Sequence, residues 1–294
     1  EGIYQGRHRT RDRGSSTEFY DYRAYTPGDP TQLIDWKLYG RTDRLYIRRF
    51  HQESQLTILL IVDGSASMQF GGFEWARRAA RNDVDLGATK FRRACELAAT
   101  LAYLGARQGD RVGLLLSGVE SASPRPVAVP PGAGWNTFRE VLTTLTGSRP
   151  RTFKSGPGTA LTDGFSHVDH LVTGAALIVG IGDGLEQPDP LIESMSRARY
   201  GAGRATASRR REVSLLQVLT DDELDIGDLG GARLVDAETG VQVRTHSDAV
   251  RSGYRERFEA HRRRLATGIL SLNGRYQLCA LSDSPVDQLR RFLT

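Results

Sequence analysis

The chain has 294 residues, of which 39% are hydrophobic, and carries a formal net charge of +5. This length fits one large α/β domain with an attached segment better than two full domains. The composition excludes a disulfide framework and a membrane-spanning helix, because the two cysteines lie far apart within apolar runs and no apolar run reaches roughly 18 residues.

Residues 1–52 are dense in Arg, Tyr, Asp and Gly and show no long apolar period. Within them, Tyr25-Thr26-Pro27-Gly28-Asp29 predicts a turn, because Pro27 presets φ and Gly28 takes the position that needs a positive φ. We expect residues 1–52 to form an arm without a core of its own, which packs on a main domain formed by residues 53–294. The expected anchors of the arm are its apolar side chains, Ile34, Trp36, Leu38, Leu45, Tyr46 and Ile47.

The main domain shows an alternation of strand and helix patterns. Four runs rich in Ile, Leu and Val predict buried strands at 56–62, 111–116, 175–181 and 213–219. The apolar spacing of Lys90–Arg107 predicts a helix that packs by one face. Other predicted elements are helices at 137–145, 160–172 and 248–268, a last strand at Tyr276–Leu281 and a closing helix at 285–293. This alternation predicts a doubly wound, mostly parallel α/β sheet.

Three stretches are predicted to be mobile or inserted, at 69–89, 197–212 and 221–231. The second contains Gly201-x-Gly203, a fragment of a dinucleotide-binding fingerprint. It follows a helix rather than a strand and lacks the third glycine at the required spacing. We therefore interpret it as a solvated arginine-rich loop.

A carboxylate and two hydroxyls follow the first predicted strand, at Asp63, Ser65 and Ser67. Doubly wound sheets bind ligands outside the carboxyl ends of their strands, and this loop is such a position. The spacing lets one short loop direct three oxygens inward, and Thr159 and Asp183 follow where this architecture would add two more. The sequence thus predicts an oxygen shell for Mg²⁺, with Mn²⁺ or Ca²⁺ as other candidate ions. The simpler alternative is that Asp63 and Ser65 only cap a turn or helix.

The order of D-x-S-x-S, a loop Thr and a strand-end Asp resembles the metal-ion-dependent adhesion site of von Willebrand factor A domains. More narrowly, almost the whole chain resembles the bacterial "domain of unknown function" family fifty-eight, which is found beside MoxR-type AAA+ ATPases. The most specific matches precede the main domain, at Gly6-x-His8, Gly14-Ser15-Ser16-x-Glu18-Phe19, Arg23-x-Tyr25-x-Pro27-Gly28-Asp29, Ile34-Asp35-Trp36-Lys37 and Arg41.

Two positions depart from the family pattern. Gly40 stands where the family usually has Ala before the arginine that matches Arg41, and Gly182 stands where it often has Ser or Thr before the second metal Asp. If that hydroxyl holds a water in relatives, the site of this chain binds metal less tightly.

The resemblance implies a protein-binding module rather than an enzyme. In A domains, a metal with one open position is completed by an Asp or Glu carboxylate of a partner protein. Three of the five candidate ligands here are neutral hydroxyls, which leaves the metal with residual positive charge. We expect a partner or adaptor of a MoxR-type AAA+ ATPase that acts in assembly or maturation of protein complexes.

Two other classes of function stay open. Asp63 and the stretch Gly182-Asp183-Gly184 resemble a haloacid-dehalogenase-like phosphohydrolase, but Ser65 replaces the acid that this chemistry needs as a proton donor. The arginine clusters at 7–13, 209–211 and 262–264 are typical of nucleic-acid binding, but they lack interleaved aromatics, so no nucleic acid is expected. His167 and His170 share one helix face without a third ligand nearby, which favours a packing or surface role.

The polar residues of the arm have two interpretations. Arg23 and Arg41 are expected to pair with Asp29 or Asp35, because charges that become buried need partners. The alternative for this block, which also contains Tyr25, Gly28 and Trp36, is direct contact with a partner protein.

Cysteine usage favours a reducing, cytoplasmic compartment. The chain begins at Glu1 rather than Met, so we expect any contact with a membrane to come only through a segment upstream of Glu1.

Overall fold

The computed structural model describes residues 19–50, 55–73, 89–123, 125–151, 160–201, 211–225, 233–235, 242–244 and 248–294. The chain divides into two compact units, Glu1–Gln55 and Leu56–Thr294. The predicted boundary between residues 52 and 53 lies outside the described residues. Across the described ranges, no helix combines the length and the apolar character needed to cross a bilayer.

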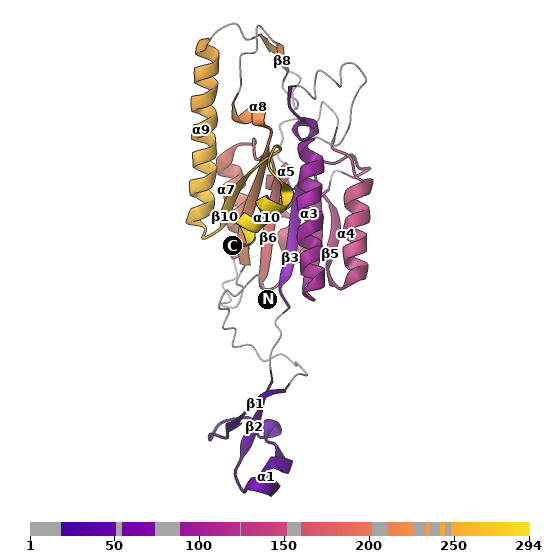
Figure 1. Ribbon diagram of the computed structural model, residues 1–294, viewed down its shortest axis with the longest axis vertical. Coiled ribbons are helices and arrows are strands. Elements are labelled where there is room, and N and C mark those ends of the chain that lie inside the picture. Colours follow the sequence, from indigo (N-terminus) through magenta and orange to yellow (C-terminus); the bar gives the residue numbers. More distant parts are fainter. Residues whose placement is uncertain are drawn as a thin grey trace. The chain divides into compact units, whose positions relative to one another are not determined.

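The first unit contains an antiparallel pair of strands and a short helix (Figure 1). Its elements are β1 (Phe19–Ala24), the 3-10 turn η1 (Thr31–Leu33), α1 (Trp36–Thr42) and β2 (Tyr46–Phe50). Ile34 and Ile47 form a bridge pair and are both buried. The unit therefore has a small apolar centre, which corrects the expectation that the arm has no core of its own.

The turn predicted in the first unit is confirmed. Asp29 donates its backbone N–H to Thr26 O at 3.0 Å, and Gly28 has a φ of 104°. Arg23 forms the expected ion pair, with Nη2 2.8 Å from Asp29 Oδ1. Beside this turn, the Tyr25 N–H donates to Leu45 O at 2.9 Å, which joins the turn to the end of the hairpin.

Asp35 begins helix α1 in the first unit. Its Oδ1 accepts the backbone N–H groups of Lys37 and Leu38, each at 3.0 Å, and Tyr22 Oη donates to its Oδ2 at 3.0 Å. Arg41 lies in the last turn of the same helix. Trp36 is 62% exposed within this unit, and its packing on the main domain stays a prediction.

The second unit is built on one six-stranded sheet (Figure 1). Across the sheet the order is β10 (Arg275–Ala280), β7 (Arg211–Leu219), β6 (Ala176–Gly182), β3 (Thr57–Asp63), β4 (Arg111–Ser117) and β5 (Val127–Ala133). Every neighbouring pair is parallel except β4 with β5. The predicted fold class is therefore confirmed, and the predicted strands correspond to the parallel ones.

Helices cover both faces of the sheet. The core on one face includes side chains of α3 (Lys90–Arg107), α4 (Trp135–Gly147) and α10 (Pro285–Leu293). The core on the other face includes side chains of α5 (Ala160–Ser166), α6 (Val168–Leu171), α7 (Pro188–Tyr200) and α9 (Asp248–Ser271). The single helix predicted at 160–172 is thus divided into α5 and α6.

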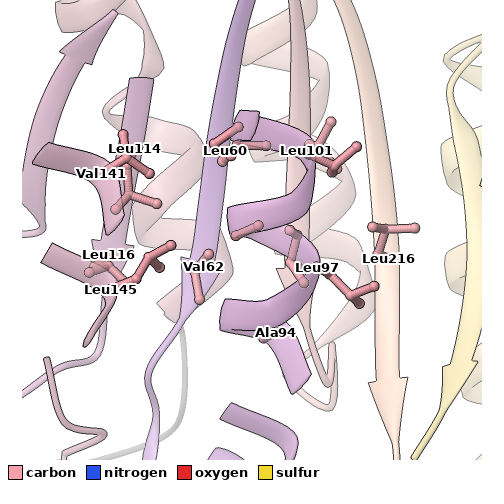
Figure 2. Packing of buried hydrophobic residues seen from close by; sticks show 14 of the residues in the cluster. Leu60, Val62, Ala94, Leu97, Leu101, Leu114, Leu116, Val141, Leu145 and Leu216 are labelled. Atoms are coloured by element: carbon pink, nitrogen blue, oxygen red, sulfur yellow. The ribbon is translucent and has the colours of Figure 1, made fainter. Parts of the chain in front are cut away.

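Figure 2 shows the first of these cores, where side chains of α3 and α4 meet strands β3, β4 and β7. Along β3, Leu60 and Val62 belong to this core, whereas Leu59 and Ile61 belong to the opposite one. All four side chains are 0% exposed, and each contributes about 1.5–3 kcal/mol by burial. Because both faces of β3 are buried, its sequence is a continuous apolar run.

The stretches predicted as mobile contain regular structure where they are described. Residues 66–69 form the 3-10 turn η2 (Ala66–Gln69), and α7 extends to Tyr200. Asp221–Leu224 is a short helix, α8, which corrects its assignment to a loop; Thr220 caps it by accepting the Glu223 N–H. A hairpin, β8 (Arg233–Val235) with β9 (Gln242–Arg244), lies outside the main sheet. Residues 74–88, most of the predicted insert, lie outside the described residues.

The direction of winding reverses at β3. The strand that follows β3 along the chain, β4, pairs with one edge of β3. The later strand β6 pairs with the other edge. The carboxyl ends of β3 and β6 therefore flank the switch point at which doubly wound sheets bind ligands.

Candidate metal centre

The two predicted acidic ligands leave neighbouring strands at the switch point. Asp63 is the last residue of β3, and Asp183 follows the last residue of β6. The parallel register pairs Val62 with Ile181, so both carboxylates emerge at the same edge of the sheet. The Gly64 N–H donates to Ser117 O at 2.7 Å, which holds the residue directly after Asp63 against the end of β4.

Hydroxyl groups join these carboxylates. Ser65 Oγ lies 3.1 Å from Ser67 Oγ, and Ser67 Oγ donates to Asp183 Oδ2 at 2.6 Å. Asp63 Oδ1 accepts the Ser65 N–H at 2.8 Å. An octahedral Mg²⁺ holds its ligands at about 2.1 Å, so adjacent ligand oxygens lie about 3 Å apart. The hydroxyl and carboxylate spacings are close to that value. The fifth predicted ligand, Thr159, lies outside the described residues.

The chemistry of these donors fits a hard cation. Asp63 and Asp183 are each 3% exposed. The side-chain atoms that the two aspartates, Ser65 and Ser67 offer to a metal ion are all oxygens. Within the described parts of the chain, no three His, Cys, Asp or Glu side chains gather as a possible metal site, so hydroxyls would have to complete the shell. Burial raises the pKa of Asp63 well above its usual range, and the charge of Asp183 raises it further. The positive charge of a bound cation would lower the pKa of Asp63, because it would offset both the burial and the charge of Asp183.

Lys90 is the residue of this centre that the sequence analysis missed. It is 0% exposed, and its Nζ lies 2.9 Å from Asp183 Oδ2 and 2.6 Å from Glu223 Oε1. Burial opposes the charged forms of Lys90 and Asp183. For Lys90, the nearby carboxylates of Asp183 and Glu223 outweigh this effect. For Asp183, the charge of Lys90 together with the hydrogen bonds from Ser67, Lys90 and Leu185 outweighs it. The pKa of Lys90 is therefore raised and that of Asp183 lowered. The only signal in the sequence is that lysine is rare in this arginine-rich chain.

A family model described as "Protein of unknown function DUF58" matches residues 21–264. The chain belongs to the DUF58 family. It is similar to uncharacterized proteins of Mycobacterium bovis and Mycobacterium tuberculosis, which are 27% identical over 278 residues. Each alignment covers 92% of this chain and 76% of the relative.

Solved structures with a similar arrangement include an aerotolerance-related membrane protein from Bacteroides fragilis, with a TM-score of 0.48 and 15% identity. That alignment covers 81% of this chain and 96% of the other. A von Willebrand factor type A structure from Catenulispora acidiphila has a TM-score of 0.41 and 11% identity, and covers 84% and 43% of the two chains. The SpRpn10 VWA domain has a TM-score of 0.38 and 10% identity, and covers 80% and 94%.

Gly182 lies directly against the Asp63 side chain. A Cβ on Gly182 would lie 2.4 Å from Asp63 Cβ and 2.9 Å from Asp63 Oδ2. Serine or threonine at this position would therefore displace the Asp63 side chain. The glycine lets Asp63 lie against the end of β6, next to Asp183.

Glu186 connects the loop after β6 to helix α5. Its carboxylate accepts the N–H groups of Leu161 at 3.0 Å and Thr162 at 3.2 Å, near the start of that helix. Burial raises the pKa of Glu186 to about 7, although these hydrogen bonds act in the opposite direction. Sequence reasoning did not include Glu186, because its role depends on a helix that begins 26 residues earlier, at Ala160.

We expect Glu186→Gln to stabilise the protein at pH 8 in the absence of divalent ions. The pKa of Glu186 is about 7 in the folded chain against 4.5 ordinarily, so stability is lost as the pH rises through this window. Glutamine keeps the acceptor oxygen without the charge. We expect a gain of about 2 kcal/mol at pH 8, discounted for partial exposure, which shrinks toward pH 5. Urea unfolding in EDTA measures both values, and an equal difference at the two pH values would contradict this account.

Other residues considered in the sequence lie elsewhere. Arg211, from one of the arginine clusters considered in the sequence, is 2% exposed and bonds Asp169. On α9, Arg262 pairs with Glu259. His167 Nδ1 lies 2.8 Å from the Asp163 carbonyl oxygen, which agrees with a packing role. The arginines at 7–13 and 209–210 lie outside the described residues.

Proposed function

We propose that this DUF58 protein is a non-enzymatic, Mg²⁺-dependent module that binds a carboxylate of a partner protein, with Mn²⁺ or Ca²⁺ as alternative ions. The observation that carries the proposal is the contact between Ser67 Oγ and Asp183 Oδ2, with Ser65 beside it. Through this contact and the Ser65–Ser67 pair, two hydroxyls lie beside Asp183, and the Ser65 N–H bonds the second buried carboxylate, Asp63.

The character of these side chains favours binding over catalysis. A bound Mg²⁺ would supply positive charge for an external Asp or Glu carboxylate. Ser65 and Ser67 are neutral, so they neutralise none of that charge, and Lys90 already balances Asp183. The phosphohydrolase alternative needs a proton donor two residues after Asp63, where Ser65 bonds Ser67 instead.

We further propose that the partner is a MoxR-type AAA+ ATPase, or one of its clients, in assembly or maturation of a protein complex. This choice rests on membership of the DUF58 family, which is expected from its resemblance to occur beside MoxR-type ATPases. Partial exposure of Ser67 gives a partner carboxylate a route to the centre.

We expect the tagged protein to retain a MoxR-type ATPase from the same genome in Mg²⁺ and to release it in EDTA. Asp63→Ala should weaken the retention at least about tenfold, or about 1.4 kcal/mol, because it removes one of the two carboxylates that would hold the ion. The matched control is Asp287→Asn, which removes an exposed carboxylate that pairs with Arg290 on α10. Quantified pull-down measures the effect, and equal retention by wild type and Asp63→Ala, with or without Mg²⁺, would refute the proposal.

A further inference from the structure

Backbone contacts hold Lys90 at the centre. Lys90 is the first residue of α3, and the Thr89 side chain caps this helix by accepting the Arg92 N–H. The Lys90 N–H donates to Phe70 O at 3.0 Å, directly after the turn that carries Ser67. The start of the helix is therefore fixed to the loop that supplies the hydroxyls.

The Lys90 ammonium bridges acidic groups from two different elements. Asp183 follows β6, and Glu223 lies in α8, where its Oε2 also accepts the Thr220 N–H at 2.8 Å. Lys90 is 0% exposed, so it cannot contact a partner protein directly. A buried charge needs such partners, and the role of this ammonium must therefore be internal.

Asp183 bonds both the Lys90 ammonium and the Ser67 hydroxyl through its Oδ2 atom. Lys90 Nζ lies 2.9 Å from it, and the Ser67 hydroxyl lies 2.6 Å from it. The other oxygen, Oδ1, accepts the Leu185 N–H at 3.1 Å. An ion held by Ser67 and Asp183 would lie close to the ammonium, and like charges repel strongly in a buried site.

We propose that Lys90 is an internal cation that competes with the metal ion for Asp183 and keeps the metal affinity of the centre low. This inference rests on the proposed metal site and adds a regulator to it. Glu223 is the second carboxylate available to the ammonium when Asp183 is engaged by an ion. Metal binding is thereby coupled to α8, whose Asp222 Oδ2 accepts the Phe73 N–H at 2.6 Å.

The test measures binding of Mn²⁺ alone, by electron paramagnetic resonance and calorimetry, to chains whose folding is verified by circular dichroism. Lys90→Met removes the competitor, and Lys90→Met/Glu223→Gln removes one charge of each sign, so that the local net charge is unchanged. We expect both variants to bind Mn²⁺ at least about tenfold more tightly than wild type.

A milder variant keeps the test decisive if the methionine variants do not fold. Glu223→Gln leaves the ammonium to Asp183 alone and should weaken Mn²⁺ binding. Asp222→Asn removes the same charge from the same helical turn, where the carboxylate bonds the Phe73 N–H, and serves as the matched control. We expect Glu223→Gln to weaken binding more than Asp222→Asn does, and equal effects would overturn the inference.

The outcomes separate this inference from the proposed function. If wild type binds Mn²⁺ and the folded methionine variants bind it no more tightly, the role of Lys90 is refuted and the metal site stands. If only the variants bind Mn²⁺, Lys90 excludes the ion, and the metal dependence proposed for wild type is refuted. If none of the chains binds Mn²⁺, both proposals are refuted.

Discussion

Asp183→Asn is expected to lower the free energy of unfolding by about 3 kcal/mol in EDTA, because it leaves the buried Lys90 ammonium short of a partner. Lys90 and Asp183 are 0% and 3% exposed, and their Nζ and Oδ2 atoms lie 2.9 Å apart. Removing one member of a buried pair typically costs about 3–5 kcal/mol. The low end applies here, since Glu223 still bonds the ammonium at 2.6 Å.

Urea unfolding of wild type and Asp183→Asn in EDTA measures this loss. The control is Asp189→Asn, whose carboxylate pairs with Arg264 at the exposed surface and should change stability by less than about 1 kcal/mol. A loss for Asp183→Asn no larger than that of the control would show that the buried pair does not stabilise the fold.

Asp63→Asn is expected to have the opposite effect on the metal-free protein. Burial and the charge of Asp183 both raise the pKa of Asp63, so its ionised form destabilises the folded chain as the pH rises above the usual value of 3.8. Asparagine keeps an oxygen for the Ser65 N–H, which lies 2.8 Å from Asp63 Oδ1, without carrying the charge. We expect a gain of at least about 1 kcal/mol at pH 8 in EDTA.

The same substitution should remove the stabilisation that Mg²⁺ is expected to give to wild type. A ligand present at about 100 times its dissociation constant stabilises a folded protein by about 2.7 kcal/mol. Thermal unfolding with and without Mg²⁺ measures the difference between the two chains. A variant that is less stable than wild type in EDTA, or that responds to Mg²⁺ as wild type does, would contradict the proposed role of Asp63.

The contrast between these variants distinguishes a metal site from a structural ion-pair network. Asp63 and Asp183 hold similar places in the predicted oxygen shell, at the ends of adjacent strands. Of these two aspartates, both within the described residues, only Asp183 accepts a hydrogen bond from the buried Lys90 ammonium. If both aspartates served the fold alone, both asparagine variants would be expected to destabilise it.

Much of the second unit follows from local pattern. The predicted helix Lys90–Arg107 has those bounds in the structure, and the predicted parallel strands lie within about two residues of the observed ones. These elements carry a strong apolar signal because both faces of the sheet are covered. On α3, Ala94 and Leu97 are buried in the core (Figure 2). Cys95 is only partly buried.

Elements with weak local signals were missed. The edge strand β5 contains Pro130 and Pro131, which interrupt a strand pattern and are tolerated at the edge of a sheet. Helix α8 is a single turn in an acidic stretch, and its capping box of Thr220 and Glu223 is the only local signal for it. In the first unit, the bridge between Ile34 and Ile47 joins residues on either side of helix α1.

For the candidate centre, the sequence by itself determined the residues that one loop or one strand end can place. Asp63, Ser65 and Ser67 lie on one short turn, and a strand-end position assigned Asp183 to the same edge of the sheet. Only the tertiary structure decided which charged groups surround Asp183. Lys90 bonds Asp183, which lies 93 positions later in the sequence, and Glu223, which lies 133 positions later. The energy of a buried charge depends on the groups that face it in space, and spacing along the chain does not encode those neighbours.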